Sequence, residues 1–301
     1  MALTSFSDLE QIVGKKSSVV RVLVVAAEDT HTLEGVSEAY SRKIMEPILI
    51  GNGVKIREII ASKNLPLGKT EIIETEDNMQ SAKRAVSLIA EGYGDVLMKG
   101  NLQTADLLRE VVNKEYGLKT GEIMSHVGLF QIPAYHKLLV LTDGGMVIAP
   151  NIEQKRQILR NAIEVLARLG MLNPKVAILC AAETENPKIQ ASVDAALLKK
   201  EYRDGLFNDC IMEGPISFDL MFDLESARAK GYVSTVAGDA DILLMPDMTA
   251  GNIVAKSLIF AAKSMMAGLI IGAKCPIVLV SRGASPEEKY LSIVFAAAVA
   301  K

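Results

Sequence analysis

Short runs of apolar, β-branched residues alternate along the chain with longer segments in which apolar residues recur at helical spacing. The early runs are SVVRVLVVAAE, PILIG and DVLMKG, and the helical segments cover roughly residues 32–44, 78–90 and 104–114. Parallel strands need crossover connections, which are usually helices. The alternation therefore predicts a mostly parallel sheet covered by helices on both faces over about the first 120 residues.

The rhythm changes at KLLVLTDGGMVIAP, residues 137–150. This segment reads as two strands joined by an Asp-Gly turn, which predicts a hairpin and the start of a new unit. Asn151 with Gln154 then predicts a capped helix that ends at Gly170. Strands and helices alternate again in KVAILCA, 189–202, DILLMPD, a long helix from Asn252, PIVLVSRG and a final helix.

The composition agrees with a buried α/β core and excludes some partners. Half of the 301 residues are hydrophobic, but only 5% are aromatic and Trp is absent, so aliphatic side chains must fill the core. A net charge of -3 gives no broad attraction to nucleic acid or to an anionic membrane. The most apolar stretch, 253–280, is interrupted by three lysines, so no uncharged run within it is long enough to predict a membrane span.

The N-terminus and the cysteines predict a cytoplasmic protein. The first residues are amphipathic and carry acids early, without the basic-then-apolar order of a secretory signal. Cys180, Cys210 and Cys275 lie far apart and are odd in number, which is typical of reduced thiols rather than of disulfides. The three histidines are equally scattered, so no zinc site is expected.

Polar residues follow four of the predicted strands, in the stretches 95–109, 179–192, 243–257 and 277–290. Ligands of an open parallel sheet collect beyond the carboxyl ends of the strands, where backbone N–H groups at helix starts point outward. The last stretch places Ser281, Arg282 and Gly283 directly after the strand IVLV. A hydroxyl, a guanidinium and a flexible backbone at one point suit a phosphoryl oxygen or a developing oxyanion.

Four motifs occur together in this order from about residue 95 onward. They are Thr-Ala-Asp-x-x-Arg at 104–109, Gly214-Pro215 with Phe218-Asp219, Pro-Asp-x-x-x-Gly-Asn-Ile at 246–253, and Ser281-Arg282-Gly283. Their combination resembles the phosphate acetyl/butyryltransferase family. Some residues look more like its butyryl branch: Met98-Lys99-Gly100, Ser125-His126, Asn186-Pro187, Ala191-Ser192 and Asp194-Ala195.

The resemblance implies two three-layer α/β domains with mostly parallel sheets and a cleft between them, as in isocitrate and isopropylmalate dehydrogenases. One domain would comprise residues 1–137 and 282–301, and the other residues 138–281. A homo-oligomer is also expected, from the family and from the apolar composition. A dehydrogenase of this architecture is disfavoured, because no GxGxxG follows a strand and no Asp cluster for metal-assisted decarboxylation is apparent.

The implied activity is reversible transfer of a short acyl group between coenzyme A and inorganic phosphate, with butyryl as the expected group. Acyl-CoA and phosphate would be the partners, with coenzyme A as a substrate and no metal or redox cofactor required. Phosphate acetyltransferase is the nearest alternative. A non-catalytic acyl-CoA or phosphate sensor on the same scaffold is an alternative of a different class.

The resemblance implies catalytic roles after the last strand. Arg282 is the expected clamp for phosphate or the carbonyl oxygen, because its planar fork binds oxyanions bidentately, and Ser281 and Gly283 would bind the same anion. Glu288 aligns with an aspartate that the family uses as a candidate base toward the thiol, so the carboxylate is kept but lengthened by one methylene. Residues 285–288 also form a capping box, so that Glu288 could be a helix cap only.

Positive charge after an earlier strand suits coenzyme A. Arg109 matches an arginine that the family uses near coenzyme A, and lies in the second turn of a helix with Thr104 as its expected N-cap and coenzyme A contact. Lys99, directly after the strand DVLM, is expected to bind an anion. The alternatives are a solvated helical arginine and a snorkelling lysine.

Three further residues complete the candidate set. His126, expected in a loop, could transfer protons or be a hydrogen-bonded structural residue. Asn252, at the expected helix start, could orient phosphate or pantetheine amides or act only as N-cap. Asn186 could contact substrate or stabilise a turn. It belongs to a group of weaker candidates at strand or loop ends, whose other members are Asp143, Asp219 and Asp247.

Overall fold

The computed structural model describes residues 3–281 and 283–301. The chain divides into two compact units. The terminal unit comprises Ser7–Met124 and Ala267–Lys301, and the central unit comprises Met1–Phe6 and Ser125–Met266. These divisions fall earlier along the chain than the predicted ones after residues 137 and 281.

The terminal unit contains a largely parallel sheet. Its strands follow the order β3 (Glu71–Glu74), β2 (Met45–Gly51), β1 (Val20–Val25), β4 (Val96–Lys99), β11 (Ile277–Val278) and β10 (Met265–Ile271). The first five run parallel, and β10 is antiparallel to β11. The side chains of β1 from Val22 to Val25 are fully buried, as expected for a strand covered on both faces.

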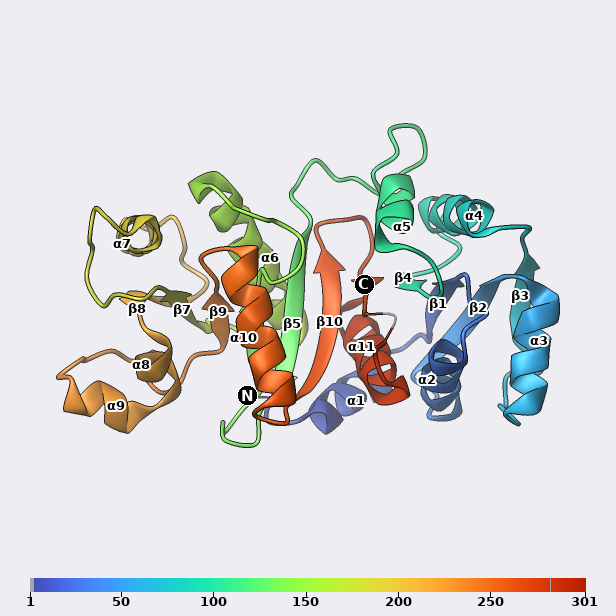
Figure 1. Cartoon of the computed structure of the whole chain (residues 1–301), viewed down its shortest axis with the longest axis horizontal. Coiled ribbons are helices and arrows are strands. Elements are labelled where there is room, and N and C mark those ends of the chain that lie inside the picture. The colour runs from blue at the N-terminus through green and yellow to red at the C-terminus, as the bar shows by residue number, and fades with distance from the viewer. Residues whose placement is uncertain (1–2, 282) are drawn as a thin grey trace. The chain divides into compact units, whose positions relative to one another are not determined.

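Helices cover both sides of this sheet. They are α1 (Phe6–Gly14), α2 (Thr30–Ser41), α3 (Gly53–Ser62), α4 (Asn78–Ala90), α5 (Thr104–Val111) and α11 (Pro286–Val299). Figure 1 shows α4 and α5 on one side of the strands and α2 and α11 on the other. Asp29 and Asp77 fix the starts of α2 and α4, because each side chain accepts a hydrogen bond from the third residue that follows it.

The central unit repeats this plan with five strands. Their order is β5 (Ser125–Gln131), β6 (Leu139–Thr142), β9 (Ile242–Leu244), β7 (Lys175–Leu179) and β8 (Ile211–Ile216), with β5 antiparallel to β6 and the rest parallel. The helices are α6 (Ile152–Arg168), α7 (Gln190–Arg203), α8 (Phe218–Phe222), α9 (Leu224–Ala229) and α10 (Met248–Phe260). Figure 1 shows α7 and α8 on opposite sides of the strands. The predicted cap at Asn151 is confirmed, and the structure shows that Asn151 and Gln154 form a complete capping box at the start of α6.

The predicted α/β fold class, with parallel strands between two layers of helices in each unit, is confirmed. The predicted hairpin at 137–150 is wrong, because β6 pairs with the preceding strand β5 and residues 143–151 form a loop. The helix expected from Asn252 begins earlier, at Met248. Among residues 3–281 and 283–301, no helix has the length and hydrophobicity of a membrane span.

Candidate functional site

In the terminal unit, the strand ends of β4 and β11 form the first group of candidate residues. The two strands are adjacent and parallel, with Met98 opposite Val278. The chain continues from β4 into α5 and from β11 into α11, and these helices lie on opposite sides of the strands (Figure 1). Such a divergence of neighbouring connections is the usual ligand site of an open α/β sheet.

Lys99 ends β4 and is buried, with only 3% of its surface exposed. Its Nζ lies 3.2 Å from the carbonyl oxygens of both Gly100 and Leu102, to which it donates hydrogen bonds. Gly100 has no room for a side chain, because a Cβ would lie 2.4 Å from the Ala26 oxygen and 2.6 Å from the Val25 oxygen. Lys99 is therefore not a snorkelling surface lysine, and it fixes the loop that leads into α5.

The helix α5 begins at Thr104, but its N-cap position belongs to Gln103, so the predicted cap role of Thr104 is wrong. Thr104 is partly exposed in the first turn. Arg109 lies in the last turn, with 61% of its side chain exposed, and its guanidinium is 3.2 Å from the Asp106 carboxylate. The guanidinium is therefore accessible to a ligand. Because an exposed ion pair of this kind adds little stability, a ligand could replace Asp106 at small energetic cost.

Ser281 and Gly283 lie on an exposed segment between β11 and α11. The N–H of Gly283 is 3.4 Å from the Ser281 hydroxyl oxygen, and the N–H of Ala284 donates to the Ser281 carbonyl at 3.1 Å. A Cβ added at Gly283 would meet nothing within 4 Å. Arg282 lies outside the described residues.

Glu288 occupies the third position of α11, and its N–H donates to the Ser285 hydroxyl at 3.1 Å. This bond is the first of the two that define the predicted capping box. Glu288 is partly exposed. The cap function of Ser285 is confirmed, and a role of the Glu288 carboxylate as a base stays a prediction.

A buried lysine anchors the start of α11 to the start of α2. Lys289 is 3% exposed, and its Nζ lies 2.8 Å from Asp29 Oδ2 and 2.9 Å from Thr32 Oγ1. Burial alone would raise the pKa of Asp29, but hydrogen bonds from Lys289 and Thr32 hold that pKa below its usual value. The sequence analysis missed this contact, because no local pattern connects residues 29 and 289.

In the central unit, the second group of candidates surrounds the loop after β6. His126 lies in strand β5, not in a loop as predicted. Its N–H donates to Asp143 Oδ2 at 3.0 Å, and its carbonyl accepts from the Thr142 hydroxyl at 2.8 Å. The ring atom Nδ1 is buried without a hydrogen-bond partner among the described residues. Burial lowers the pKa of the imidazole, against the opposing field of Asp143, so the ring is neutral at neutral pH.

Asp143 is the centre of this group and is almost completely buried. Besides the His126 N–H, its carboxylate accepts from the N–H groups of Gly145 at 2.7 Å, Met146 at 2.8 Å and Val147 at 3.3 Å. These bonds turn residues 143–147 back on themselves. They explain why this segment is a loop rather than the second strand of a hairpin.

Asn252 reaches the same loop from α10. Its Nδ2 lies 3.4 Å from the Gly144 carbonyl oxygen, and its side chain is exposed. The N-cap of α10 is Asp247, whose carboxylate accepts from the Ala250 N–H at 2.9 Å, so the cap role considered for Asn252 is wrong. Gly251 allows the close approach, because a Cβ there would lie 2.5 Å from the Asp143 carbonyl oxygen.

Asn186 lies apart from the Asp143 loop, on the exposed segment that leads into α7. Its side-chain oxygen accepts from the Lys188 N–H at 3.0 Å, and its backbone N–H donates to the Ser192 hydroxyl at 2.8 Å. These bonds are those of an asparagine that stabilises a turn. A substrate contact by Asn186 stays a prediction.

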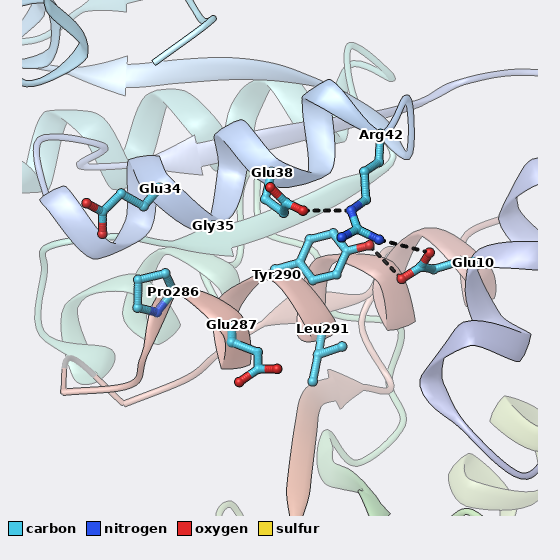
Figure 2. A pocket seen from close by; sticks show the side chains of 9 residues that line it. All are labelled: Glu10, Glu34, Gly35, Glu38, Arg42, Pro286, Glu287, Tyr290 and Leu291. Carbon is cyan, nitrogen blue, oxygen red and sulfur yellow. Dashed lines mark hydrogen bonds and ion pairs between the residues drawn. The ribbon is translucent and has the colours of Figure 1, made fainter. Parts of the chain in front are cut away.

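A surface pocket of about 550 Å³ lies elsewhere in the terminal unit (Figure 2). Its charged lining consists of one guanidinium and four carboxylates, from Arg42, Glu10, Glu34, Glu38 and Glu287. Arg42 is already bound to Glu38 at 2.6 Å and lies near Glu10 at 3.4 Å. Excess negative charge disfavours a phosphate-bearing ligand there. In the described part of the chain, no group of three or more His, Cys, Asp or Glu is placed to hold a metal ion.

Comparisons with known proteins identify the family to which this chain is similar. Residues 76–297 match the family model described as "Phosphate acetyl/butaryl transferase". A phosphate butyryltransferase from Clostridium beijerinckii is 40% identical to this chain, over 95% of both proteins. A phosphate acetyltransferase from Rhizobium meliloti is also 40% identical, over 95% of this chain and 91% of that protein. The crystal structure of a branched-chain phosphotransacylase from Enterococcus faecalis V583 is 35% identical and superposes with a TM-score of 0.84, covering 93% of this chain and 99% of that one.

Proposed function

This chain belongs to the phosphate acetyl/butyryltransferase family and is a phosphate acyltransferase, and from that premise we propose that its preferred acyl group is butyryl or a similar short chain. The reaction would be butanoyl-CoA + phosphate = butanoyl phosphate + CoA. Acyl-CoA and phosphate are the substrates that the family implies. A sensor without catalytic activity is no longer a competing interpretation.

The observation that supports the butyryl assignment is the position of two sequence features typical of the butyryl branch. Met98-Lys99-Gly100 ends β4 with a buried lysine and a glycine that admits no side chain. Ser125-His126 begins β5, where the Ser125 hydroxyl accepts from Asn161 Nδ2 at 2.8 Å. Both features therefore lie in fixed backbone next to the candidate strand ends. The Enterococcus protein, whose printed name specifies branched-chain substrates, supports the same assignment.

The transfer itself needs an anion clamp and an oxyanion site. In our proposal the coenzyme A thiolate attacks the carbonyl carbon of the acyl phosphate, and the tetrahedral oxyanion collapses with loss of phosphate. Arg282 and the Ser281 hydroxyl would bind the phosphate oxygens or the oxyanion, together with the N–H of Gly283. The exposure of Ser281 and Gly283 supports this role, because both can reach a bound anion.

The thiol must lose its proton before it attacks. Glu288 and His126 are the two proposed acceptors of that proton. A neutral imidazole can accept a proton, and burial favours the neutral form of His126. The carboxylate of Glu288 lies one turn into α11, next to the exposed segment that carries Ser281.

Binding of coenzyme A is assigned to side chains at and after the end of β4 in the terminal unit and to two asparagines of the central unit. Arg109 is accessible for a phosphate of coenzyme A, and Lys99 and Thr104 shape the entrance to its helix. Asn252 and Asn186 present amide groups on exposed segments of the central unit. The predicted domain boundaries and the cleft between the domains stay part of this proposal.

Phosphate acetyltransferase is the second candidate function, because the Rhizobium relative matches as well as the Clostridium one. The two activities differ by two methylenes in the acyl group, each worth about 0.8 kcal/mol when buried. A thiol-release assay with phosphate and acetyl-, propionyl-, butyryl- and isobutyryl-CoA decides between them. We expect the highest kcat/KM with the four-carbon substrates, and a preference for acetyl-CoA would replace the butyryl assignment.

We also propose a homo-oligomeric, cytoplasmic enzyme. The large apolar side chains of Ile253 and Phe260 are 60% and 70% exposed on α10, which suits burial against a second copy. The cysteines Cys180, Cys210 and Cys275 are free and buried, as in a reducing compartment. Analytical ultracentrifugation tests the first point, where a monomer at micromolar concentration contradicts it, and cell fractionation tests the second.

A further inference from the structure

The strongest unexplained feature of the central unit is a buried carboxylate whose hydrogen-bond donors, among the described residues, are all backbone N–H groups. Asp143 is 3% exposed, and it accepts hydrogen bonds from four N–H groups, those of His126, Gly145, Met146 and Val147. Three of these donors belong to its own loop. The fourth belongs to the neighbouring strand and to the histidine that is a candidate for proton transfer.

Asp143 and its neighbour Thr142 bind the His126 backbone at both of its polar groups, the N–H and the carbonyl oxygen. Asp143 accepts from the His126 N–H, and the Thr142 hydroxyl donates to the His126 carbonyl oxygen at 2.8 Å. Both partners are buried. The start of β5 therefore cannot move without breaking bonds to the end of β6.

The loop that Asp143 organises also packs against the His126 imidazole. A Cβ added at Gly145 would lie 3.4 Å from His126 Cγ and 3.7 Å from Cδ2, so the glycine backbone faces the ring. The Gly145 N–H makes the shortest of the four bonds to Asp143. Nδ1 of His126 has no partner among the described residues, so the contact with Gly145 is the observed restraint on this side of the ring.

We infer that Asp143 is a positioning residue for acyl transfer, which orients the His126 imidazole through the His126 N–H and through Gly145. This inference rests on the proposed role of His126 in the transfer. It assigns a function to the Asp-Gly-Gly segment beyond closing a turn. It also separates Asp143 from carboxylates that only cap helices, such as Asp223 at the start of α9.

A double-mutant cycle tests the inference in the full chain. Asp143→Asn keeps the shape but replaces one acceptor with a donor, and we expect kcat to fall about 30-fold while KM values change less than threefold. His126→Gln should lower kcat by about 100-fold. In the His126→Gln background, Asp143→Asn should have almost no further effect. Asp223→Asn is the matched control, because it alters a backbone-binding carboxylate far along the sequence from both residues and should leave kcat unchanged.

Several results would overturn the inference. Equal losses from Asp143→Asn in both backgrounds would mean a general structural role, and a fully active His126→Gln variant would remove the residue through which Asp143 is supposed to act. If Asp143→Asn does not fold, Thr142→Val removes the other bond to the His126 backbone with little change in shape. We expect a loss of about fivefold in kcat that disappears in the His126→Gln background, and a loss that persists there contradicts the inference.

A spectroscopic readout keeps this test independent of the reaction. The chain has three histidines, so the imidazole resonances of His126 are assigned by their loss in His126→Gln. Asp143→Asn should shift the His126 resonances and leave those of His31 and His136 in place. Unchanged His126 resonances would refute the positioning role even in an enzyme that transfers no acyl group, whereas absent turnover with shifted resonances would count against the proposed function alone.

Discussion

The strand ends of the two units hold their candidate residues in different ways. In the terminal unit, Ser281 and Gly283 are exposed and make long or local hydrogen bonds, and Arg109 is engaged only by weak surface contacts. In the central unit, Asp143 is buried and ties together His126 and the loop after β6. We therefore expect the first region to adjust to a bound anion and the second to keep a fixed geometry. We infer that anion binding belongs to the terminal unit and orientation of the reacting group to the central unit.

The largest effect is expected from the anion clamp. Arg282→Ala should lower kcat/KM by about 10³-fold, because it removes a charged, bidentate donor to the developing oxyanion. Arg282→Lys should restore only part of the activity, since it keeps the charge and loses the planar fork. Steady-state kinetics with acyl-CoA and phosphate measure both variants. A larger loss from Asp143→Asn than from Arg282→Ala would reverse the division of roles between the two units.

The next effect separates a base from a helix cap at the start of α11. Glu288→Gln keeps a side chain that can cap the helix but cannot accept the thiol proton, so we expect kcat to fall about 100-fold with an unchanged melting temperature. Ser285→Ala should do the reverse, lowering stability by about 1 kcal/mol with little effect on kcat. Thermal unfolding and kinetics on both variants decide the matter. An active Glu288→Gln enzyme leaves His126 as the remaining candidate for proton transfer.

Much of the fold was predictable because it depends on local patterns. Apolar runs of strand length and helical periodicity identify β1, β2 and β4 and the helices α2, α4 and α5, whereas α3 and β3 were not predicted. The predicted cap at Asn151 is correct for the same reason, since all of its atoms lie within four residues. The four polar stretches after strands were also identified correctly as strand-to-helix junctions, because the carboxyl ends of parallel strands share one edge.

The errors arose where distant residues decide the structure. Asp-Gly-Gly at 143–145 has the composition of a hairpin turn, but the Asp143 carboxylate binds His126 on another strand and folds the segment into a loop. Lys99 was expected to bind an anion at the strand end, with a snorkelling surface lysine as the alternative, yet the carbonyls of its own loop accept its hydrogen bonds inside the protein. The contact between Lys289 and Asp29 joins residues 260 positions apart, which no local motif can indicate.

A pair of glycine variants compares a fixed backbone with an adjustable one inside the terminal unit. Gly100→Ala should lower stability by about 2 kcal/mol, because the new methyl group would meet two carbonyl oxygens of the β1 end. Activity should fall about tenfold as the loop after Lys99 shifts. Gly283→Ala should preserve both, since a Cβ there meets nothing within 4 Å and its N–H is retained. Urea unfolding and kinetics check both, and equal sensitivity of the two positions would contradict the view that the Ser281 segment is the adjustable one.

The smallest effect is expected at Arg109, whose guanidinium is exposed and forms a surface ion pair that adds little to stability. Arg109→Ala should leave the free energy of unfolding within about 0.5 kcal/mol of the parent value, because an exposed pair such as Arg109–Asp106 contributes little. If the guanidinium binds a phosphate of coenzyme A, KM for acyl-CoA should rise about threefold at low salt, and this difference should shrink at high salt as the charges are screened. Arg228→Ala is the matched control, because Arg228 forms a similar exposed pair with Glu225, three residues earlier on α9. A KM that rises equally in both variants would attribute the effect to net charge, and would remove Arg109 from the anion-binding side of the comparison.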